Sequence, residues 1–306
     1  MKTITPKDTK LGFIGVGYMG RPIAQRLLQA GFSLAAYDRN RAKAEELARY
    51  GGAVAESIGE VASGCDVLLS CLASDEAVLS VYLGGSTALA SMRPGSLVIE
   101  MSTVSPETSR QLAEHGSHHG IHVLDVTISG STPTAEQGAL VLFGGGGQTC
   151  FDAAESIFRA IARKCFYMGP SGSGATMKLV VNALLGIGMQ AIAEAVALGE
   201  KAGLERNPLL AVLSQTAVIA PAHIGKFERA INGDFTPQFP LRLMNKDFGL
   251  ILSLAAVVGA RVPATDAAFE VNARRLDEGK EEDFSAVILQ MEKQDHLVPV
   301  VESHFR

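Results

Sequence analysis

Two patterns of hydrophobic and polar positions divide the chain. Over residues 11–165, short apolar runs alternate with amphipathic stretches in which apolar residues recur every three or four positions. This alternation predicts βαβ units that build a doubly wound parallel sheet. The expected strands are residues 11–16, 32–38, 67–72, 97–102, 122–129, 139–144 and 165–169, and the expected helices include residues 21–30, 41–50 and 105–116.

The second pattern begins near residue 174 and is helical. Residues 174–202 are rich in Ala, Leu, Val and Met, and at 1.5 Å per residue they predict a helix roughly 40 Å long. Later segments also indicate helices separated by Pro, Gly and Asn. We therefore expect the α/β class, with a Rossmann-type parallel-sheet domain (residues 1–169) followed by an all-α domain (residues 170–306) that begins with a long interdomain helix.

Composition limits the binding partners and the cellular compartment that we expect for the protein. The 306 residues are 47% apolar and 19% charged, with 27 basic and 32 acidic residues, so we expect compact cores and no nucleic-acid partner. The first ten residues have no apolar signal-like run, and the apolar runs are too short or too interrupted by polar residues to span a bilayer, so no membrane segment is expected. Four cysteines without a CxxC pair are typical of a cytoplasmic chain. The long apolar helix predicts a homo-oligomer, a dimer or tetramer, because it needs more cover than a small domain offers.

A glycine motif marks the first predicted turn. Gly15, Gly17 and Gly20 stand in G-x-G-x-x-G spacing between an apolar strand and an amphipathic helix. This context suits a dinucleotide site, in which the glycines allow a tight turn, close approach of the pyrophosphate and helix packing. An ordinary glycine turn is the alternative for an isolated match. Asp38 follows Gly20 by 18 residues, near the distance expected of a ribose-binding acid, and favours the dinucleotide interpretation.

The cofactor type stays open between NAD and NADP. An Asp38 carboxylate that accepts from the ribose 2'-hydroxyl favours NAD slightly, whereas Arg39 and Arg41 could pair with a 2'-phosphate. A later glycine run, residues 144–147, has no matching acid, so we interpret it as a chain turn without a ligand.

Four motifs in order resemble those of the β-hydroxyacid dehydrogenase family, which includes 3-hydroxyisobutyrate dehydrogenases and glyoxylate/succinic semialdehyde reductases. They are GFIGVGYMGRPIAQRL, DVTISGS at Asp125–Ser131, GSGATMKLVVN at Gly172–Asn182, and FPLRLMNKDFGLIL from Phe239. The last motif, with DFSAVI near the C-terminus, is most similar to the glyoxylate and succinic semialdehyde reductase branch. The resemblance implies an NAD(P)-dependent enzyme that interconverts a short aldehyde or oxo acid and its hydroxy acid.

Lys178 is the predicted proton donor or acceptor. It lies early in an apolar helix, where desolvation is expected to lower its pKa and its charge would stabilise a developing alkoxide. Asn182 lies one helical turn further on the same face, so both polar groups can converge on one oxygen. A lysine that extends from the helix to solvent is the alternative.

The resemblance also implies substrate and cofactor residues. Ser129, Gly130 and Ser131 would hold a substrate carboxylate, although Ser131 replaces the usual second glycine and Val126-Thr127 replace Ala-Pro. Thr103 would lie beside nicotinamide and substrate, with a helix N-cap as its alternative, and Phe239 would be a substrate residue or simply core. The full predicted cofactor set is Gly15, Val16, Gly17, Tyr18, Met19, Gly20, Asp38, Arg39, Leu72, Thr103, Lys246 and Asp247.

No metal site is expected. His115 and His119 have helical i, i+4 spacing, but no acid or cysteine beside them completes a ligand set, so a solvated helix end is the preferred interpretation. Two rival functions remain. An imine reductase of the same fold commonly lacks the lysine, and a non-catalytic dinucleotide-binding protein would have no need of the lysine motif.

Overall fold

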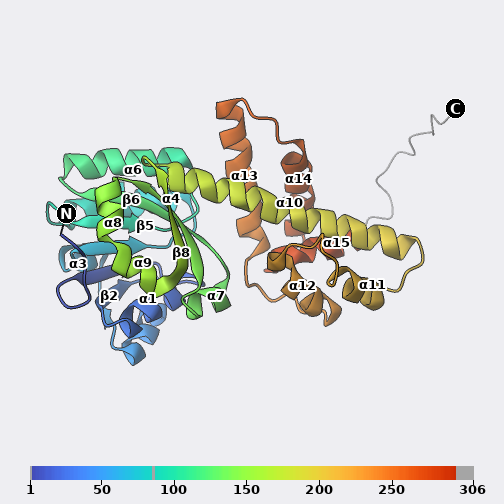
Figure 1. The fold of residues 1–306 in the computed structure, drawn as a ribbon, viewed down its shortest axis with the longest axis horizontal. Helices are drawn as coiled ribbons and strands as arrows, with labels where there is room; N and C mark the ends of the chain where they lie inside the picture. The colour runs from blue at the N-terminus through green and yellow to red at the C-terminus, as the bar shows by residue number, and fades with distance from the viewer. Residues whose placement is uncertain (1, 85–86, 294–306) are drawn as a thin grey trace. The chain divides into compact units, whose positions relative to one another are not determined.

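The computed structural model describes residues 2–84 and 87–293, and the chain divides into two compact units, Met1–Val181 and Asn182–Arg306. Figure 1 shows a sheet with flanking helices in the first unit and helices in the second. The expected α/β class with an all-helical second part is confirmed.

The first unit is built on one eight-stranded sheet. Its strand order is β3-β2-β1-β4-β5-β6-β7-β8, and every neighbouring pair is parallel except the antiparallel pair β6 and β7. The strands are β1 (Lys10–Ile14), β2 (Ser33–Tyr37), β3 (Ala53–Val54), β4 (Val67–Ser70), β5 (Leu97–Glu100), β6 (His122–Ser129), β7 (Leu140–Gly146) and β8 (Ala162–Gly169).

Helices cover both faces of this sheet, because its central strands are apolar on both sides. All four residues of β4 and all four of β5 are buried, as parallel strands between two helical layers require. Successive residues of a strand point to opposite faces of the sheet, so Leu69 packs in the apolar cluster on one face and Leu68 in the cluster on the other. The helices are α1 (Gly20–Gln29), α2 (Arg41–Glu45), α3 (Ile58–Ser63), α4 (Asp75–Leu83), α5 (Ala88–Ser91), α6 (Pro106–His118), α7 (Thr132–Glu136), α8 (Gln148–Ala153) and α9 (Glu155–Ile161), with the 3-10 turn η1 (Glu46–Tyr50).

The glycine run near residue 144 is not the turn that its composition suggested. Gly144, Gly145 and Gly146 form the end of strand β7 and pair with β6. A Cβ on Gly144 would stand 2.2 Å from the Phe151 ring, and one on Gly145 would stand 2.6 Å from an Asp125 carboxylate oxygen. These glycines are explained by close packing on the strand, so the prediction of a turn is wrong.

The regular elements of the second unit are all helices in its described residues up to Lys293, with one isolated β-bridge between Pro240 and Asp283. The long helix α10 (Ser173–Lys201) belongs to both units and supplies buried residues to each, such as Ala175 in the first and Met189 in the second. By length and composition it is the one helix in the described part of the chain that could cross a membrane, and 44% of its most apolar window is buried. The others are α11 (Arg206–Leu213), α12 (Pro221–Ile231), α13 (Leu241–Val258), α14 (Pro263–Leu276), η2 (Phe284–Ala286) and α15 (Val287–Lys293).

Small residues on α10 allow close packing in the second unit. A Cβ on Gly186 would stand 2.3 Å from the Phe248 ring of α13, and one on Gly188 would stand 2.7 Å from the His223 ring of α12. The His223 Nε2 also lies 2.9 Å from the carbonyl oxygen of Leu185, which fixes α12 against the same stretch of α10.

Candidate active site

The glycine turn between β1 and α1 has the backbone that a dinucleotide site requires. Gly15 has φ +89°, and a Cβ there would stand 2.4 Å from the carbonyl oxygen of Cys71. A Cβ on Gly20 would stand 2.0 Å from the carbonyl oxygen of Gly15, so helix and turn touch directly. Gly17 differs, since no described atom lies within 4 Å of its Cβ position. The turn therefore leaves open space beside Gly17 at a helix N-terminus, which fits a pyrophosphate.

Asp38 holds the turn in place from the end of β2. Its carboxylate accepts hydrogen bonds from the backbone N–H of Val16 (3.0 Å) and of Asn40 (2.8 Å). Arg41, the candidate partner of a 2'-phosphate, is already engaged, because its guanidinium pairs with Glu45 and Glu56. Of the two candidate arginines, Arg41 is therefore engaged by glutamates, whereas Arg39 is exposed beside Asp38.

Strands β4 and β5 end in a buried hydrogen-bond network that the sequence alone did not reveal. Glu100 is 2% exposed and accepts the backbone N–H of Ser102 at 2.9 Å. The Ser102 hydroxyl in turn accepts the backbone N–H of Leu72 at 2.7 Å, and the Tyr82 hydroxyl donates to Ser70 at 2.8 Å. The network joins the loops after β4 and β5, which carry two of the predicted cofactor residues, Leu72 and Thr103.

Burial raises the pKa of Glu100 to about 7, since desolvation penalises the carboxylate more than the hydrogen bonds from Ser102 and Ser70 stabilise it. The available sequence signal was an acid at the end of an otherwise apolar strand. Thr103 lies just beyond, and it does not cap α6. The N-cap is Ser105, whose hydroxyl accepts the N–H of Thr108 at 3.1 Å, so the capping alternative for Thr103 is wrong.

The end of β6 carries the predicted substrate motif. Ser129 is the last strand residue, and Gly130 follows with φ +146°, a conformation that a side chain would strain. Ser131 is the N-cap of α7, where its hydroxyl lies 2.8 Å from the Thr134 hydroxyl and its N–H donates to the same oxygen at 2.8 Å. The hydroxyl that replaces the usual glycine thus contacts the first turn of α7.

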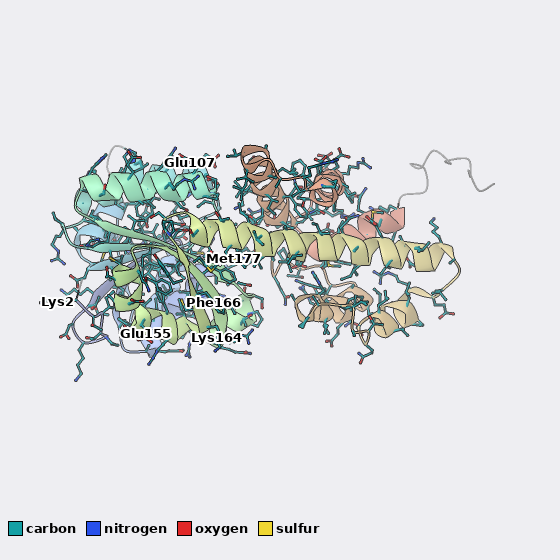
Figure 2. All side chains as sticks on the ribbon, turned by 45° about the horizontal axis from the view of Figure 1, so that its top comes forward. Lys2, Glu107, Glu155, Lys164, Phe166 and Met177 are labelled. Carbon is teal, nitrogen blue, oxygen red and sulfur yellow. The ribbon has the colours of Figure 1, made fainter. Side chains whose placement is uncertain are left out.

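Lys178 lies in the second turn of α10 and is half-buried. Figure 2 labels its neighbour Met177 on this helix. The parallel strands β1, β2, β4, β5 and β6 all point their carboxyl ends to one edge of the sheet, so the glycine turn, Leu72, Thr103 and Ser129 share that edge. A ligand crevice is expected there in a doubly wound fold.

The second unit brings together Asn182, Lys246 and Asp247. Asn182 is 1% exposed and donates from Nδ2 to the Asp247 carboxylate at 2.6 Å, while Lys246 Nζ lies 2.9 Å from the other oxygen of Asp247. Because a carboxylate only accepts, this bond fixes the orientation of the Asn182 amide. The sequence placed all three in the site but gave no sign of contact between residues 65 positions apart.

Phe239, the remaining predicted residue of the second unit, is held by Asp283. The Asp283 carboxylate accepts the N–H of Phe239 at 3.0 Å, and the Phe239 ring meets the Phe284 ring edge-on at 5.6 Å between centroids. Half-buried Phe239 is therefore part of a packed loop, and the sequence did not identify Asp283 as its anchor.

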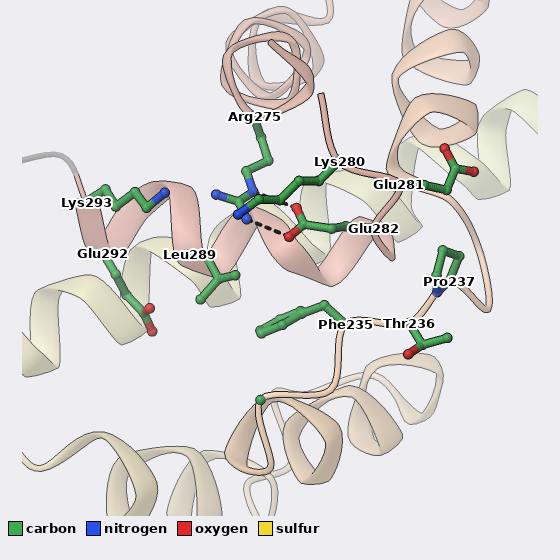
Figure 3. A pocket seen from close by; sticks show the side chains of 11 residues that line it. Phe235, Thr236, Pro237, Arg275, Lys280, Glu281, Glu282, Leu289, Glu292 and Lys293 are labelled. Atoms are coloured by element: carbon green, nitrogen blue, oxygen red, sulfur yellow. Dashed lines mark hydrogen bonds and ion pairs between the residues drawn. The ribbon is translucent and has the colours of Figure 1, made fainter. Parts of the chain in front are cut away.

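A separate hollow in the second unit does not involve the predicted residues. It measures about 770 Å³, and Figure 3 shows it between Phe235, Arg275 and Glu282. The Arg275 guanidinium pairs with Glu282 at 2.7 Å, which leaves the lining charges largely matched within the protein. We assign this hollow no ligand.

The histidines of α6 contact their own helix. His115 Nδ1 lies 2.9 Å from the Gln111 carbonyl oxygen, and His119 Nδ1 lies 2.9 Å from that of His115. Within residues 2–84 and 87–293, no group of three or more His, Cys, Asp or Glu side chains is arranged to hold a metal ion.

Comparison with known proteins identifies the family. Residues 10–169 match the NAD binding domain of 6-phosphogluconate dehydrogenase, and residues 172–291 match the NAD-binding domain of NADP-dependent 3-hydroxyisobutyrate dehydrogenase. The chain belongs to the 3-hydroxyisobutyrate dehydrogenase-like β-hydroxyacid dehydrogenases. In this family, glyoxylate/succinic semialdehyde reductase 1 of Arabidopsis thaliana is 34% identical over 91% of this chain and 97% of its own length.

Two further proteins that the chain resembles carry different kinds of name. The 3-hydroxyisobutyrate dehydrogenase structure from Salmonella typhimurium is 28% identical, with a TM-score of 0.85 over 92% of this chain and 99% of that one. Cytokine-like nuclear factor N-PAC of Xenopus tropicalis is 33% identical over 93% of this chain. The chain spans about half the length of N-PAC, since it covers 53% of that protein.

Proposed function

We propose that this chain is an NAD(P)-dependent oxidoreductase that interconverts a short aldehyde or oxo acid and its hydroxy acid. The observation that carries the proposal is Lys178, half-buried in the second turn of α10 within the complete G-x-G-x-x-x-K-x-x-x-N motif. The open space at Gly17, beside a helix N-terminus, supports dinucleotide binding in the same unit.

The dinucleotide, when bound, supplies the hydride in reduction and accepts it in oxidation. In reduction, the carbonyl oxygen gains negative charge, and Lys178 gives it a proton from its ammonium group as the new C–H bond forms. In oxidation, the neutral amine of Lys178 takes the hydroxyl proton. In the direction of reduction, the positive charge of the Lys178 ammonium group near the oxygen also lowers the energy of the developing alkoxide, which is a transition-state effect.

The substrate carboxylate would lie at the end of β6. Ser129 offers a hydroxyl there, and Gly130 offers a backbone that has no side chain to block an anion. Ser131 would act by shaping the loop, since its hydroxyl and N–H both contact Thr134. Thr103 would complete this side, next to the nicotinamide.

Asn182, Lys246, Asp247 and Phe239 would form the contribution of the second unit. Asp247 orients the Asn182 amide through the 2.6 Å hydrogen bond from Nδ2, so that Oδ1 would be available to accept a hydrogen bond from a substrate hydroxyl. Lys246 and Phe239 would contact the cofactor and substrate, respectively, as the family motif implies.

NAD is the favoured cofactor. The Asp38 carboxylate sits where a ribose-binding acid is expected, and Arg41 is paired with two glutamates, so a 2'-phosphate would have to displace existing ion pairs. Titration of NADH and NADPH fluorescence should give the smaller Kd for NADH, and Asp38→Ser should narrow the difference.

The activity test compares NADH and NADPH consumption with glyoxylate, succinic semialdehyde, tartronate semialdehyde and methylmalonate semialdehyde. Lys178→Ala should lower kcat/KM by about 10²- to 10⁴-fold with the dinucleotide Kd unchanged. Lys201→Ala, at the exposed far end of the same helix, is the matched control and should retain activity. Full activity in the Lys178 variant would reject the assignment.

The same set of carbonyl substrates also tests two alternative functions, imine reduction and dinucleotide binding without catalysis. A cyclic imine added to it tests for imine reduction, which Lys178 argues against. The relative N-PAC is named as a nuclear factor and not as an enzyme, and this favours keeping a dinucleotide-binding protein without catalysis as the second candidate. Dinucleotide binding without turnover of any carbonyl would select it.

We further propose a cytoplasmic homo-oligomer, a dimer or tetramer. All four cysteines lie in the described part of the chain as reduced thiols, which suits a reducing compartment. On α10, Leu184 is 74% exposed and Leu198 is 73% exposed, and exposed apolar side chains of this size are typical of a face that another subunit covers. Sedimentation equilibrium at micromolar concentration tests this, and a monomer would contradict it.

A further inference from the structure

The first turn of α10 is fastened to β6 by two buried side chains. Asp125 accepts the backbone N–H of Gly172 on one carboxylate oxygen and that of Ala175 on the other, both at 2.9 Å. Thr127, two residues along the same face of the strand, donates from its hydroxyl to the carbonyl oxygen of Gly174 at 2.8 Å. Asp125 is 2% exposed and Thr127 is fully buried.

Glycines on both sides make this attachment possible. A Cβ on Gly174 would stand 2.3 Å from the Asp125 carbonyl oxygen and 2.6 Å from that of Phe143. A Cβ on Gly145 of β7 would stand 2.9 Å from the Gly174 nitrogen. Any side chain at either position would push the helix off the sheet, so the helix start is held at backbone contact distance.

The backbone groups that Asp125 and Thr127 bind lie at the start of α10, within six residues of Lys178. The first N–H groups of a helix lack partners within it, and Asp125 satisfies two N–H groups at this helix start. In an α-helix the carbonyl of Gly174 is the one that accepts the N–H of residue 178. The Thr127 hydroxyl therefore holds the same carbonyl on which the backbone of Lys178 depends.

We propose that Asp125 and Thr127 are positioning residues for Lys178. Their three hydrogen bonds set the place of the helix start, and hence the place from which the lysine side chain extends. The inference rests on the proposed function for its catalytic consequence but not for the attachment itself.

The test uses Thr127→Val, which removes the hydroxyl at nearly constant volume, and Thr127→Ser, which retains it. Two measurements are made on the full chain. The first is backbone hydrogen exchange of the peptide covering residues 172–181, with a peptide from α14 as the internal control. The second is steady-state kinetics with the best carbonyl substrate of the panel, together with the dinucleotide Kd.

The valine variant should exchange the 172–181 peptide at least several-fold faster, with the α14 peptide unchanged, because the helix start has lost a buried hydrogen bond. Its kcat should fall about 10-fold while KM and the dinucleotide Kd stay within two-fold, since misplacement of a reacting group slows the chemical step. The serine variant should keep the values of the original chain.

Asp125→Asn is the second variant, since an amide oxygen can accept only part of what the carboxylate accepts. It should produce the same pair of changes. Unchanged exchange in both variants would overturn the attachment, and faster exchange with unchanged kcat would overturn the positioning role. If the original chain reduces no carbonyl, the proposed function fails, whereas the exchange data still decide whether the attachment exists.

Discussion

Asp125 in the first unit and Asp283 in the second are buried carboxylates, each at the centre of a hydrogen-bond cluster, and they differ in the groups that surround the charge. Asp125 in the first unit accepts backbone N–H groups of Gly172 and Ala175. Asp283 in the second accepts backbone N–H groups as well, but it also pairs with the Lys226 ammonium at 2.8 Å. The Asp125 carboxylate is thus stabilised by neutral backbone amides, whereas the Asp283 carboxylate is also stabilised by a cation.

The protonation of the two acids follows this difference. Burial raises the pKa of Asp125, because the amide hydrogen bonds only partly offset the loss of solvent. Burial alone would also raise the pKa of Asp283, but Lys226 and the hydrogen bonds lower it below its ordinary value. We infer that Asp283 keeps the Phe239 loop together through a permanent charge, whereas Asp125 acts mainly through the geometry of its bonds to α10.

The largest expected effect comes from Asp283→Asn. It leaves the buried Lys226 ammonium without its counter-charge and should lower the free energy of unfolding by about 3 to 5 kcal/mol. Asp125→Asn should cost less, about 1 to 3 kcal/mol, since its partners are neutral amides and only one of them would lose its acceptor. The chain has no tryptophan, so urea unfolding is best followed by circular dichroism.

Glu155→Gln, in an exposed ion pair with Arg159, serves as the control and should change little. Equal losses for the Asp125 and Asp283 variants would show that the cation adds nothing, and the comparison between the two carboxylates would fail.

A smaller effect is expected from Glu100→Gln, beside Asp125 on the sheet. Glu100 pairs in register with Asp125, and its pKa of about 7 lies above its ordinary value of 4.5. The folded state therefore holds a proton that the unfolded state has lost, and stability falls as pH rises between these values. The loss is about 1.4 kcal/mol per pH unit, or about 3 kcal/mol over the window.

Glutamine has no such proton, so urea unfolding of the variant at pH 5, 6, 7 and 8 should show a flatter profile than that of the original chain. Parallel profiles for the two proteins would mean that Glu100 is already ionised in the folded state.

Local patterns predicted the fold well where local physics decides it. The buried strand Val67–Ser70, the turn at Gly15 and the helical second part all follow from apolar period and glycine placement. The two-residue strand Ala53–Val54 was missed, because so short a strand has no period to read. The glycines of β7 were misread, because a ring and a carboxylate from elsewhere in the chain explain them.

The candidate site divides in the same way. Lys178 and the residues at the ends of strands could be named from motifs, whereas their supports could not. The Asn182 to Asp247 bond spans 65 positions and the Lys226 to Asp283 bond spans 57, and no local pattern marks either pair. The hydrogen bonds of Asp125 were equally hidden, since they come from amides 47 and 50 residues away.

The smallest predicted effect is that of Ser285→Ala. The Ser285 hydroxyl donates to the Asp283 carboxylate at 2.8 Å, one of several donors there that include Lys226 and the N–H groups of Gln238 and Phe239. Because the charge keeps its cation, loss of one neutral donor should cost about 1 kcal/mol and leave KM unchanged. Unfolding in urea and initial rates measure both. A loss as large as that of Asp283→Asn would mean that the hydroxyl, and not Lys226, carries the stabilisation of this carboxylate, and the contrast with Asp125 would then rest on the number of donors instead of their charge.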